Sequence, residues 1–207
     1  MYVPTINRIE DQAALLAYMR AYSFAALATS GAGGLMATHL PFVIEEAGGR
    51  ITLLAHMAKA NPQWRDFAAG AEALVIFMQP HAYVSPRLYD SRQNVPTWNY
   101  VAVHAYGRPL LIEERAAKIE LQKKLIRQHD PGYLTQMAEL PDSYLDARLA
   151  AIVSFSLAVT RIDARYKLSQ DKNPAERERI ARELEAGGDG VAVETARLMR
   201  ERSRSAS

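Results

Sequence analysis

Three polar side chains in residues 56–61 could together hold an anion: His56, Lys59 and Asn61. They follow an apolar run typical of a strand and precede Pro62, a residue type that is tolerated in the first turn of a helix. Free N–H groups and the helix dipole favour negative charge at such a helix start. The segment is therefore a candidate phosphate site. The simpler alternative is that Lys59 is solvated and Asn61 only caps the helix.

A second chemical cluster lies at residues 95–100, where Thr97, Trp98 and Asn99 are neighbours. An indole ring can stack on a flat ligand ring, and a hydroxyl and an amide can hydrogen-bond to its edge. These residue types suit the planar part of a ligand. The alternative is that the aromatic side chains plug the end of a barrel, because large aromatics are usually part of a core.

Several other chemistries lack their residue patterns. No glycine-rich phosphate loop, dinucleotide motif or G-x-S-x-G nucleophile elbow occurs in the sequence. The absence of cysteine excludes disulfides, thiolate metal sites and cysteine nucleophiles. We expect no metal site, because the histidines stand singly, at His39, His56, His81, His104 and His129.

Composition sets limits on partners and location. The formal net charge of +2 lacks the strongly basic field of a dedicated nucleic-acid-binding protein. The first residues show no basic segment followed by an apolar one, and no apolar run approaches about 20 residues. We therefore expect a cytoplasmic protein without a membrane span.

Most of the chain predicts β-strands that position these two clusters. Residues 24–27 and 35–44 flank a glycine-rich turn and predict a hairpin. Residues 51–55 predict a third strand, which ends before the polar stretch that begins at position 56. The apolar run at residues 73–78 predicts a central strand that is buried on both faces.

Two further strands complete the predicted sheet. Residues 100–106 alternate and predict a strand that ends at Gly107, and residues 151–162 predict the last long strand.

Four further helices are predicted besides the one that begins at Pro62. Asp11 can cap a helix to residue 21, residues 113–129 are amphipathic, and Asn173 with Pro174 begins a helix that ends at two glycines. A last helix over residues 191–202 precedes a serine-rich tail that we expect to be disordered. Six or seven strands with separate helices predict an α+β fold, mostly β, in which helices decorate a β-barrel.

Six blocks of the sequence together resemble the PaiB family. They occur in the family's order over nearly the whole chain. The most specific runs are Asn-Pro-Gln-Trp at residues 61–64, within the block at 56–64, and Pro-Thr-Trp-Asn-Tyr at residues 96–100, within the block at 95–104. The other blocks are Met-Tyr-Val-Pro at 1–4, Thr-His-Leu-Pro-Phe at 38–42, Ala-Tyr-Val-Ser-Pro at 82–86 and Lys-Leu-Ser-Gln at 167–170. The resemblance implies an FMN-binding split β-barrel at residues 1–170, usually homodimeric, with C-terminal helices and a tail at 171–207.

The resemblance also implies roles for particular residues. The phosphate of FMN would lie at the segment of His56, Met57, Lys59 and Asn61, and the isoalloxazine ring along the strand of Thr38, His39 and Leu40. Thr97, Trp98 and Asn99 would border the ring or its ribityl chain, with Trp98 as the stacking residue. Lys167, Ser169 and Gln170 would close the site. The sequence departs from the family at Asp171, where asparagine is common, and a carboxylate near a phosphate would be unfavourable.

Family members are generally described as FMN-binding negative transcriptional regulators, so the resemblance implies this function. Arginines at positions 197, 200, 202 and 204 face few acids in the sequence and could contact DNA, although no helix-turn-helix pattern is present. One alternative is a flavin-dependent oxidoreductase, either flavin-reductase-like or haem-degrading, on the same fold. No residue stands out as the acid or base of such an enzyme. Another alternative is a flavin sensor whose redox state changes a partner interaction.

Overall fold

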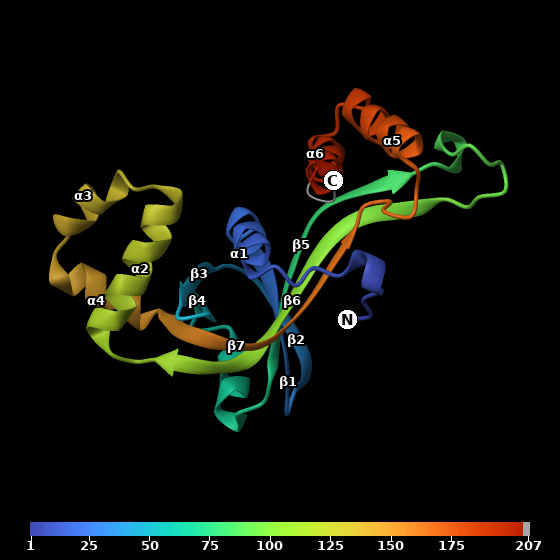
Figure 1. The fold of residues 1–207 in the computed structure, drawn as a ribbon. Helices are drawn as coiled ribbons and strands as arrows, with labels where there is room; N and C mark the ends of the chain where they lie inside the picture. Colours follow the sequence, from blue (N-terminus) through green and yellow to red (C-terminus); the bar gives the residue numbers. More distant parts are fainter. Residues whose placement is uncertain (205–207) are drawn as a thin grey trace. The chain divides into compact units, whose positions relative to one another are not determined.

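The computed structural model describes residues 1–204, with the exception of the side chains of residues 68, 69, 203 and 204 (Figure 1). The elements in chain order are η1 Thr5–Asn7, α1 Gln12–Ala21, β1 Phe24–Gly31, β2 Gly34–Pro41, β3 Val43–Ala47, β4 Arg50–Ala58, η2 Pro62–Ala69, β5 Ala73–Val84, η3 Pro86–Leu88, β6 Thr97–Ile112, α2 Arg115–His129, α3 Tyr133–Ala138, α4 Asp142–Ala150, β7 Ile152–Lys167, α5 Pro174–Ala186 and α6 Gly190–Arg204. The predicted α+β class is confirmed.

The chain forms two compact units. The sheet unit comprises Leu16–Phe77 and His104–Ile162. The terminal unit comprises Met1–Leu15, Met78–Val103 and Asp163–Ser207, of which the last segment is described to residue 204. Both sides of residue 170 belong to the terminal unit, so the domain boundary predicted there stays a prediction.

The strands follow the hydrogen-bonded order β2-β1-β5-β6-β7-β4-β3. Strands β1 and β2 form the predicted hairpin, whose register runs from Phe24 opposite Pro41 to Gly31 opposite Gly34. Strand β5 pairs antiparallel with the other side of β1, and β4 pairs antiparallel with both β3 and β7. The order leaves β2 and β3 as the two edge strands.

Aromatic side chains form the centre of the sheet unit. Phe42, Phe77 and Phe155 are each fully buried, and Phe42 contacts both other rings with centroid distances of 6.1 and 6.3 Å. Phe67 anchors η2 to this core, because its ring lies 5.0 Å from that of Phe155. The segment after β4 is thus held in place by apolar packing.

Helices α2, α3 and α4 form a group within the sheet unit (Figure 1). Leu121 and Leu125 of α2 are buried and pack with Val43 and Leu54 of β3 and β4. The predicted helix at 113–129 is confirmed as α2. Helices α3 and α4 were not predicted, because they have only 6 and 9 residues and a short helix gives little periodic signal.

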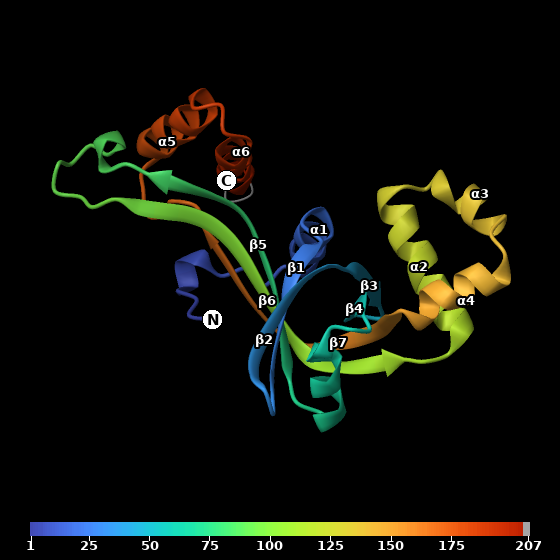
Figure 2. The same ribbon diagram turned by 180° about the vertical axis from the view of Figure 1, so that it is seen from behind.

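Helices α5 and α6 lie side by side in the terminal unit (Figure 2). Asn173 forms the predicted N-terminal cap as part of a capping box with Glu176. Ile180 of α5 and Ala196 and Met199 of α6 are buried. The predicted last helix is confirmed, while the tail expected to be disordered lies partly outside the described residues, which end at 204.

The prediction that residues 73–78 are buried on both faces is wrong. Strand β5 alternates, with Val75 and Phe77 fully buried, Leu74 and Ile76 half-buried, and Met78 53% exposed. One face of the strand therefore lies outside the core, although both faces are apolar.

Strand β6 does not end at Gly107 but continues through it to Ile112. A Cβ atom at Gly107 would lie 2.3 Å from the carbonyl oxygen of Ala158 and 2.6 Å from the Leu157 side chain. Glycine is required by this close approach to β7 rather than by a turn. Among the described residues, no helix is long and apolar enough to cross a membrane.

Candidate functional site

Residues 56–58 belong to strand β4, so the prediction that the third strand ends at residue 55 is wrong. His56 lies opposite Ser154 and Met57 opposite Val153 in the antiparallel pairing with β7. A partner strand far along the chain extends β4, and local sequence does not show such pairing. Met57 is buried, with 2% of its surface exposed, so its side chain is part of the core.

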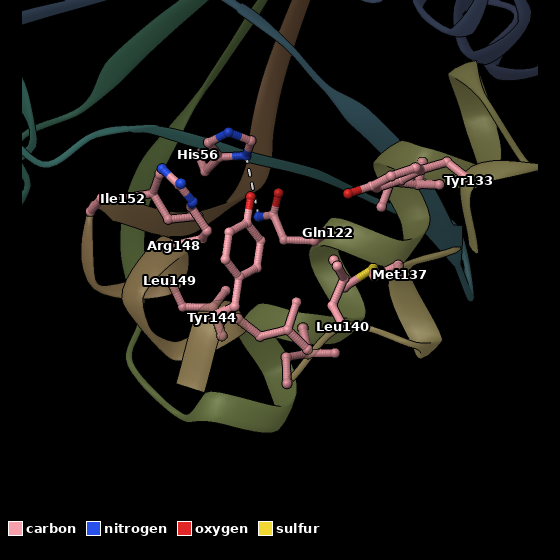
Figure 3. Close-up of a pocket in the computed structure, with 13 residues that line it drawn as sticks. His56, Gln122, Tyr133, Met137, Leu140, Tyr144, Arg148, Leu149 and Ile152 are labelled. Atoms are coloured by element: carbon pink, nitrogen blue, oxygen red, sulfur yellow. Dashed lines mark hydrogen bonds between the residues drawn. The ribbon is translucent and has the colours of Figure 1, made fainter. Parts of the chain in front are cut away.

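The side chain of His56 lines a pocket together with residues of α2, α3 and α4 (Figure 3). Its Nδ1 lies 3.3 Å from Nε2 of Gln122. Since an amide nitrogen donates, Nδ1 is the acceptor and the ring proton lies on Nε2. Burial lowers the pKa of His56, which favours the neutral ring. Neither Lys59 nor Asn61 lines this pocket.

Asn61 forms the N-terminal cap of η2, as predicted. Its side-chain oxygen accepts a hydrogen bond from the backbone N–H of Gln63 at 3.0 Å. Its Nδ2 donates to Oγ1 of Thr38 in β2 at 2.8 Å. Both ends of the amide are therefore used within the chain, and Asn61 joins the start of η2 to the β1–β2 hairpin.

Lys59 lies between β4 and η2 with an exposed side chain. Its backbone N–H donates to the carbonyl of Ala151 at 2.9 Å, which fixes the position of its Cα. Within the described part of the chain its ammonium group makes no ion pair. The charge of Lys59 is therefore available to an anion.

Gln63 is a residue of this segment that sequence reasoning missed. It is fully buried, and its Nε2 donates to the carbonyls of Leu27 and Met36 at 3.0 and 3.2 Å and to the hydroxyl of Thr29 at 3.2 Å. Its Oε1 is buried without a hydrogen-bond partner among the described residues. Only the position after an Asn-Pro cap could have suggested a structural role for this glutamine.

The three predicted residues of β2 do not share one face. Thr38 and Leu40 lie on one side of the strand, where Thr38 contacts Asn61 and Leu40 is buried. His39 lies on the other side, exposed and stacked on Phe24 with a centroid distance of 6.2 Å. A ligand that runs along this strand would contact its backbone and only one set of side chains.

In the terminal unit, Asn99 and Ser169 form a buried pair. The Ser169 hydroxyl lies 3.0 Å from Nδ2 and 3.1 Å from Oδ1 of Asn99. Nδ2 of Asn99 also lies 3.3 Å from the sulfur of Met199. Ser169 adopts a positive φ of 59°, a conformation that non-glycine residues seldom adopt. This pair holds the chain after β7 against β6 and α6.

Lys167 and Gln170 also use their polar atoms within the terminal unit. The Lys167 ammonium donates to the hydroxyl of Thr97 and, at 2.6 Å, to the carbonyl of Trp98. Burial, followed by the charge of Arg165, lowers the pKa of Lys167.

The side-chain oxygen of Gln170 accepts hydrogen bonds from the backbone N–H of Leu168 at 2.7 Å and from Nδ2 of Asn7 at 3.2 Å. Its side-chain nitrogen donates to the carbonyl of Tyr166. Asp171 is exposed and pairs with Lys172 at 3.1 Å.

Trp98 presents an aromatic surface to solvent. Its side chain is 52% exposed, and its ring lies 5.7 Å from His81 and 6.1 Å from Tyr83. An exposed indole beside two other rings can stack on a planar ligand. Trp98 is therefore not a core residue, and its role as a ligand-stacking residue stays a prediction.

The structure thus assembles three pairs from the predicted residues. They are Thr38 with Asn61, Lys167 with the Thr97–Trp98 segment, and Asn99 with Ser169. In the sheet unit, Lys59 has an available ammonium group, and in the terminal unit, Trp98 has an exposed ring. His56 instead faces the pocket of α2–α4.

The fold of this chain, a seven-stranded sheet of this order with associated helices, is similar to the folds of two solved flavoproteins. The FAD and haem binding protein of Mycobacterium smegmatis is 18% identical with a TM-score of 0.62, and the match covers 83% of this chain and 78% of that one. The flavocytochrome Anf3 of Azotobacter vinelandii is 19% identical with a TM-score of 0.60, and the match covers 75% of this chain and 67% of that one. These structures show the fold.

Sequence comparison shows the family. Residues 1–161 match the family model described as "Putative FMN-binding domain". The chain is 34% identical over 205 residues to "Protease synthase and sporulation protein PAI 2" of Bacillus subtilis, a match that covers 98% of each protein. The chain therefore belongs to the PaiB family of FMN-binding proteins, and its predicted cofactor is FMN.

The residues after β4 fit such a cofactor. A phosphate requires cationic or N–H donors, and Lys59 offers an exposed ammonium group without an ion pair in the described chain. Asn61 and Gln63 hold the backbone around it, since both are tied to the β1–β2 hairpin. The donor chemistry therefore suits the phosphate end of FMN.

Proposed function

We propose that this protein is an FMN-binding regulator of gene expression, in which Lys59 holds the phosphate of FMN. The observation that carries the proposal is the exposed ammonium group of Lys59, which makes no ion pair with the described residues and lies on a backbone fixed by Ala151 and Asn61. Similarity to a protein named for protease synthesis and sporulation supports the regulatory part.

Each residue would make a separate contribution to binding. Lys59 would neutralise phosphate charge, and the Asn61–Thr38 hydrogen bond would keep the start of η2 in place for it. Trp98, as the exposed ring, stays the predicted stacking residue. When bound, FMN supplies a redox-active isoalloxazine ring.

Titration with FMN tests the phosphate assignment. We expect Lys59→Ala to weaken FMN binding by about 1–3 kcal/mol, or roughly fivefold to 150-fold, because one charge-assisted contact is lost. Lys118→Ala, in α2 of the same unit, is the matched control and should bind FMN normally. Equal affinity of the Lys59→Ala and unmodified proteins would overturn the assignment.

We further propose that the protein is a homodimer that uses the outer face of β1 and β2. Along this face Phe24 and Leu35 are 67% and 86% exposed, and small side chains lie between them at Ala26, Ala28 and Ala37. The face lacks charged side chains along these strands, and depletion of charge is typical of the centre of an interface.

Sedimentation analysis tests this dimer. We expect Ala37→Glu to produce monomers, because it would bury a carboxylate in the proposed interface. Ala71→Glu, at an exposed position outside the sheet, should leave the oligomeric state unchanged. A monomeric unmodified protein would contradict the proposal.

Two of the four C-terminal arginines, Arg197 and Arg200, are paired with acids, contrary to the expectation that these arginines face few acids. Arg197 pairs with Glu194 and Glu201, and Arg200 pairs with Glu178 and Glu185. These pairs join α6 to itself and to α5. We therefore propose that repression in the cytoplasm does not depend on DNA contacts from Arg197 or Arg200.

A gel-shift experiment on the promoter of the protein's own operon tests direct DNA binding. If the regulator binds DNA directly, FMN-loaded protein should shift the fragment at low salt, and Arg197→Gln should shift it equally. Absence of any shift at low salt, with and without FMN, would rule out direct binding and leave regulation through a protein partner.

A further inference from the structure

A pocket of about 470 Å³ lies in the sheet unit, and neither Lys59 nor Asn61 lines it. This volume is within the range of about 300–1,000 Å³ that is typical of small-molecule sites. The pocket is formed by α2, α3 and α4 together with β4 and the start of β7 (Figure 3). No residue of the proposed phosphate segment other than His56 lines it.

The lining separates into an apolar part and a polar end. Figure 3 shows the Gln122 amide, the Tyr144 hydroxyl and the Arg148 guanidinium at the end of the pocket where the His56 ring lies. Aliphatic side chains supply most of the remaining wall, namely Ile119, Ile126, Met137, Leu140, Leu145, Leu149 and Ile152. A ligand with an apolar body and one polar head would match this division.

Arg148 is the one lining residue with a full positive charge, and the lining contains no carboxylate. The two acids of α4 are already used, because Asp142 and Asp146 each lie 2.6 Å from the guanidinium of Arg115. Within the described chain Arg148 has no acidic partner, and its guanidinium lies over the Tyr144 ring at 4.8 Å. An anionic head group would therefore meet an uncompensated charge.

The other polar groups of the lining are neutral. His56 is held as a neutral acceptor toward Gln122, and burial lowers its pKa. Tyr133, Tyr144 and Gln122 provide hydroxyl and amide groups without charge. One cation favours a head group with a single negative charge over the two charges of a phosphate monoester.

We propose that this pocket binds an amphipathic monocarboxylate, a small molecule with one carboxylate on an alkyl or aromatic body. The carboxylate would pair with Arg148, and the body would lie against the aliphatic wall of α2 and α4. The proposal does not depend on FMN, because Lys59 and Asn61 do not line the pocket.

Calorimetric titration of the full-length, FMN-loaded protein with octanoate tests the proposal. We expect octanoate to bind, and 1-octanol and octylammonium, which share its chain but not its charge, to bind at least tenfold more weakly. Arg148→Gln should weaken octanoate binding at least tenfold. Arg127→Gln, on α2 outside this pocket, is the matched control and should bind octanoate normally.

A second variant tests the apolar part of the pocket. Leu140 is half-buried in the lining, and Leu140→Trp should fill the space and abolish octanoate binding while FMN binding and the circular dichroism spectrum stay normal. No octanoate binding to the unmodified protein at millimolar concentration would overturn the proposal. Equal binding by Arg148→Gln, or release of FMN by octanoate, would also overturn it.

Discussion

The segment after β4 and the chain around the end of β7 both carry residues predicted to bind FMN. They differ in how many of their polar groups already form hydrogen bonds or ion pairs within the chain. Lys59 has an exposed ammonium group with no ion pair in the described chain. Lys167, in contrast, donates to Thr97 and to the carbonyl of Trp98, and burial lowers its pKa. Two lysines that look equivalent in the sequence thus have different capacities for a ligand.

The two asparagines differ in the same way. Asn61 is half-buried and its cap is made with a residue two positions away, whereas Asn99 is fully buried and bonds to Ser169, seventy positions away. A buried polar group whose partners are all supplied by the chain supports the fold. A charged group that lacks a partner in the chain is the better candidate for a ligand.

The largest expected effect is the loss of stability on replacement of Asn99. Asn99→Leu would leave the hydroxyl of Ser169 without its partner in a buried environment, so we expect the free energy of unfolding to fall by about 3 kcal/mol. Urea denaturation measures this loss. Asn94→Ala, outside the buried pair, should cost less than about 1 kcal/mol, and similar losses for both variants would remove the distinction between the two asparagines.

Asn61→Ala should cost less than the change at Asn99. It removes one N-terminal cap and the bond to Thr38, and loss of a cap typically costs about 1 kcal/mol. Asn61→Asp keeps the capping oxygen and should retain most of the stability. A loss at Asn61 as large as that at Asn99, again measured in urea, would show that this segment depends on tertiary contacts as strongly as the buried pair does.

Replacement of Lys167 sharpens the contrast between the lysines. Because its ammonium is already bonded within the chain, Lys167→Met should change FMN affinity by less than about threefold, or about 0.6 kcal/mol. Lys59→Ala should cause a much larger change in the same fluorescence titration. Equal losses would support the role of Lys167 in the site that the family resemblance implies.

The smallest expected effect concerns pH. The pKa of His56 is lowered by burial, so the unfolded chain takes up the proton more readily than the folded chain. The free energy of unfolding should therefore fall as the pH falls below about 6.5, and no contribution from His56 should remain well above that pH. His56→Gln should show a shallower decline in denaturation curves measured across this range, and an unchanged decline would contradict the neutral, buried state.

Elements whose partners lie close in sequence could be predicted. The Asn61 cap of η2 and the capping box of Asn173 with Glu176 each involve residues within three positions of one another. The β1–β2 hairpin depends on its glycine-rich turn. The family motifs likewise indicated FMN and the fold, because they preserve the residue types at fixed spacings.

Tertiary structure alone decided the surroundings of the predicted site residues. His56 faces α2–α4 because β4 pairs with β7, and Gly107 continues a strand because Ala158 approaches it closely. The sequence by itself determined the local caps, the hairpin and the family. It could not determine which polar groups stay available, because the partners that use them come from strands and helices far along the chain.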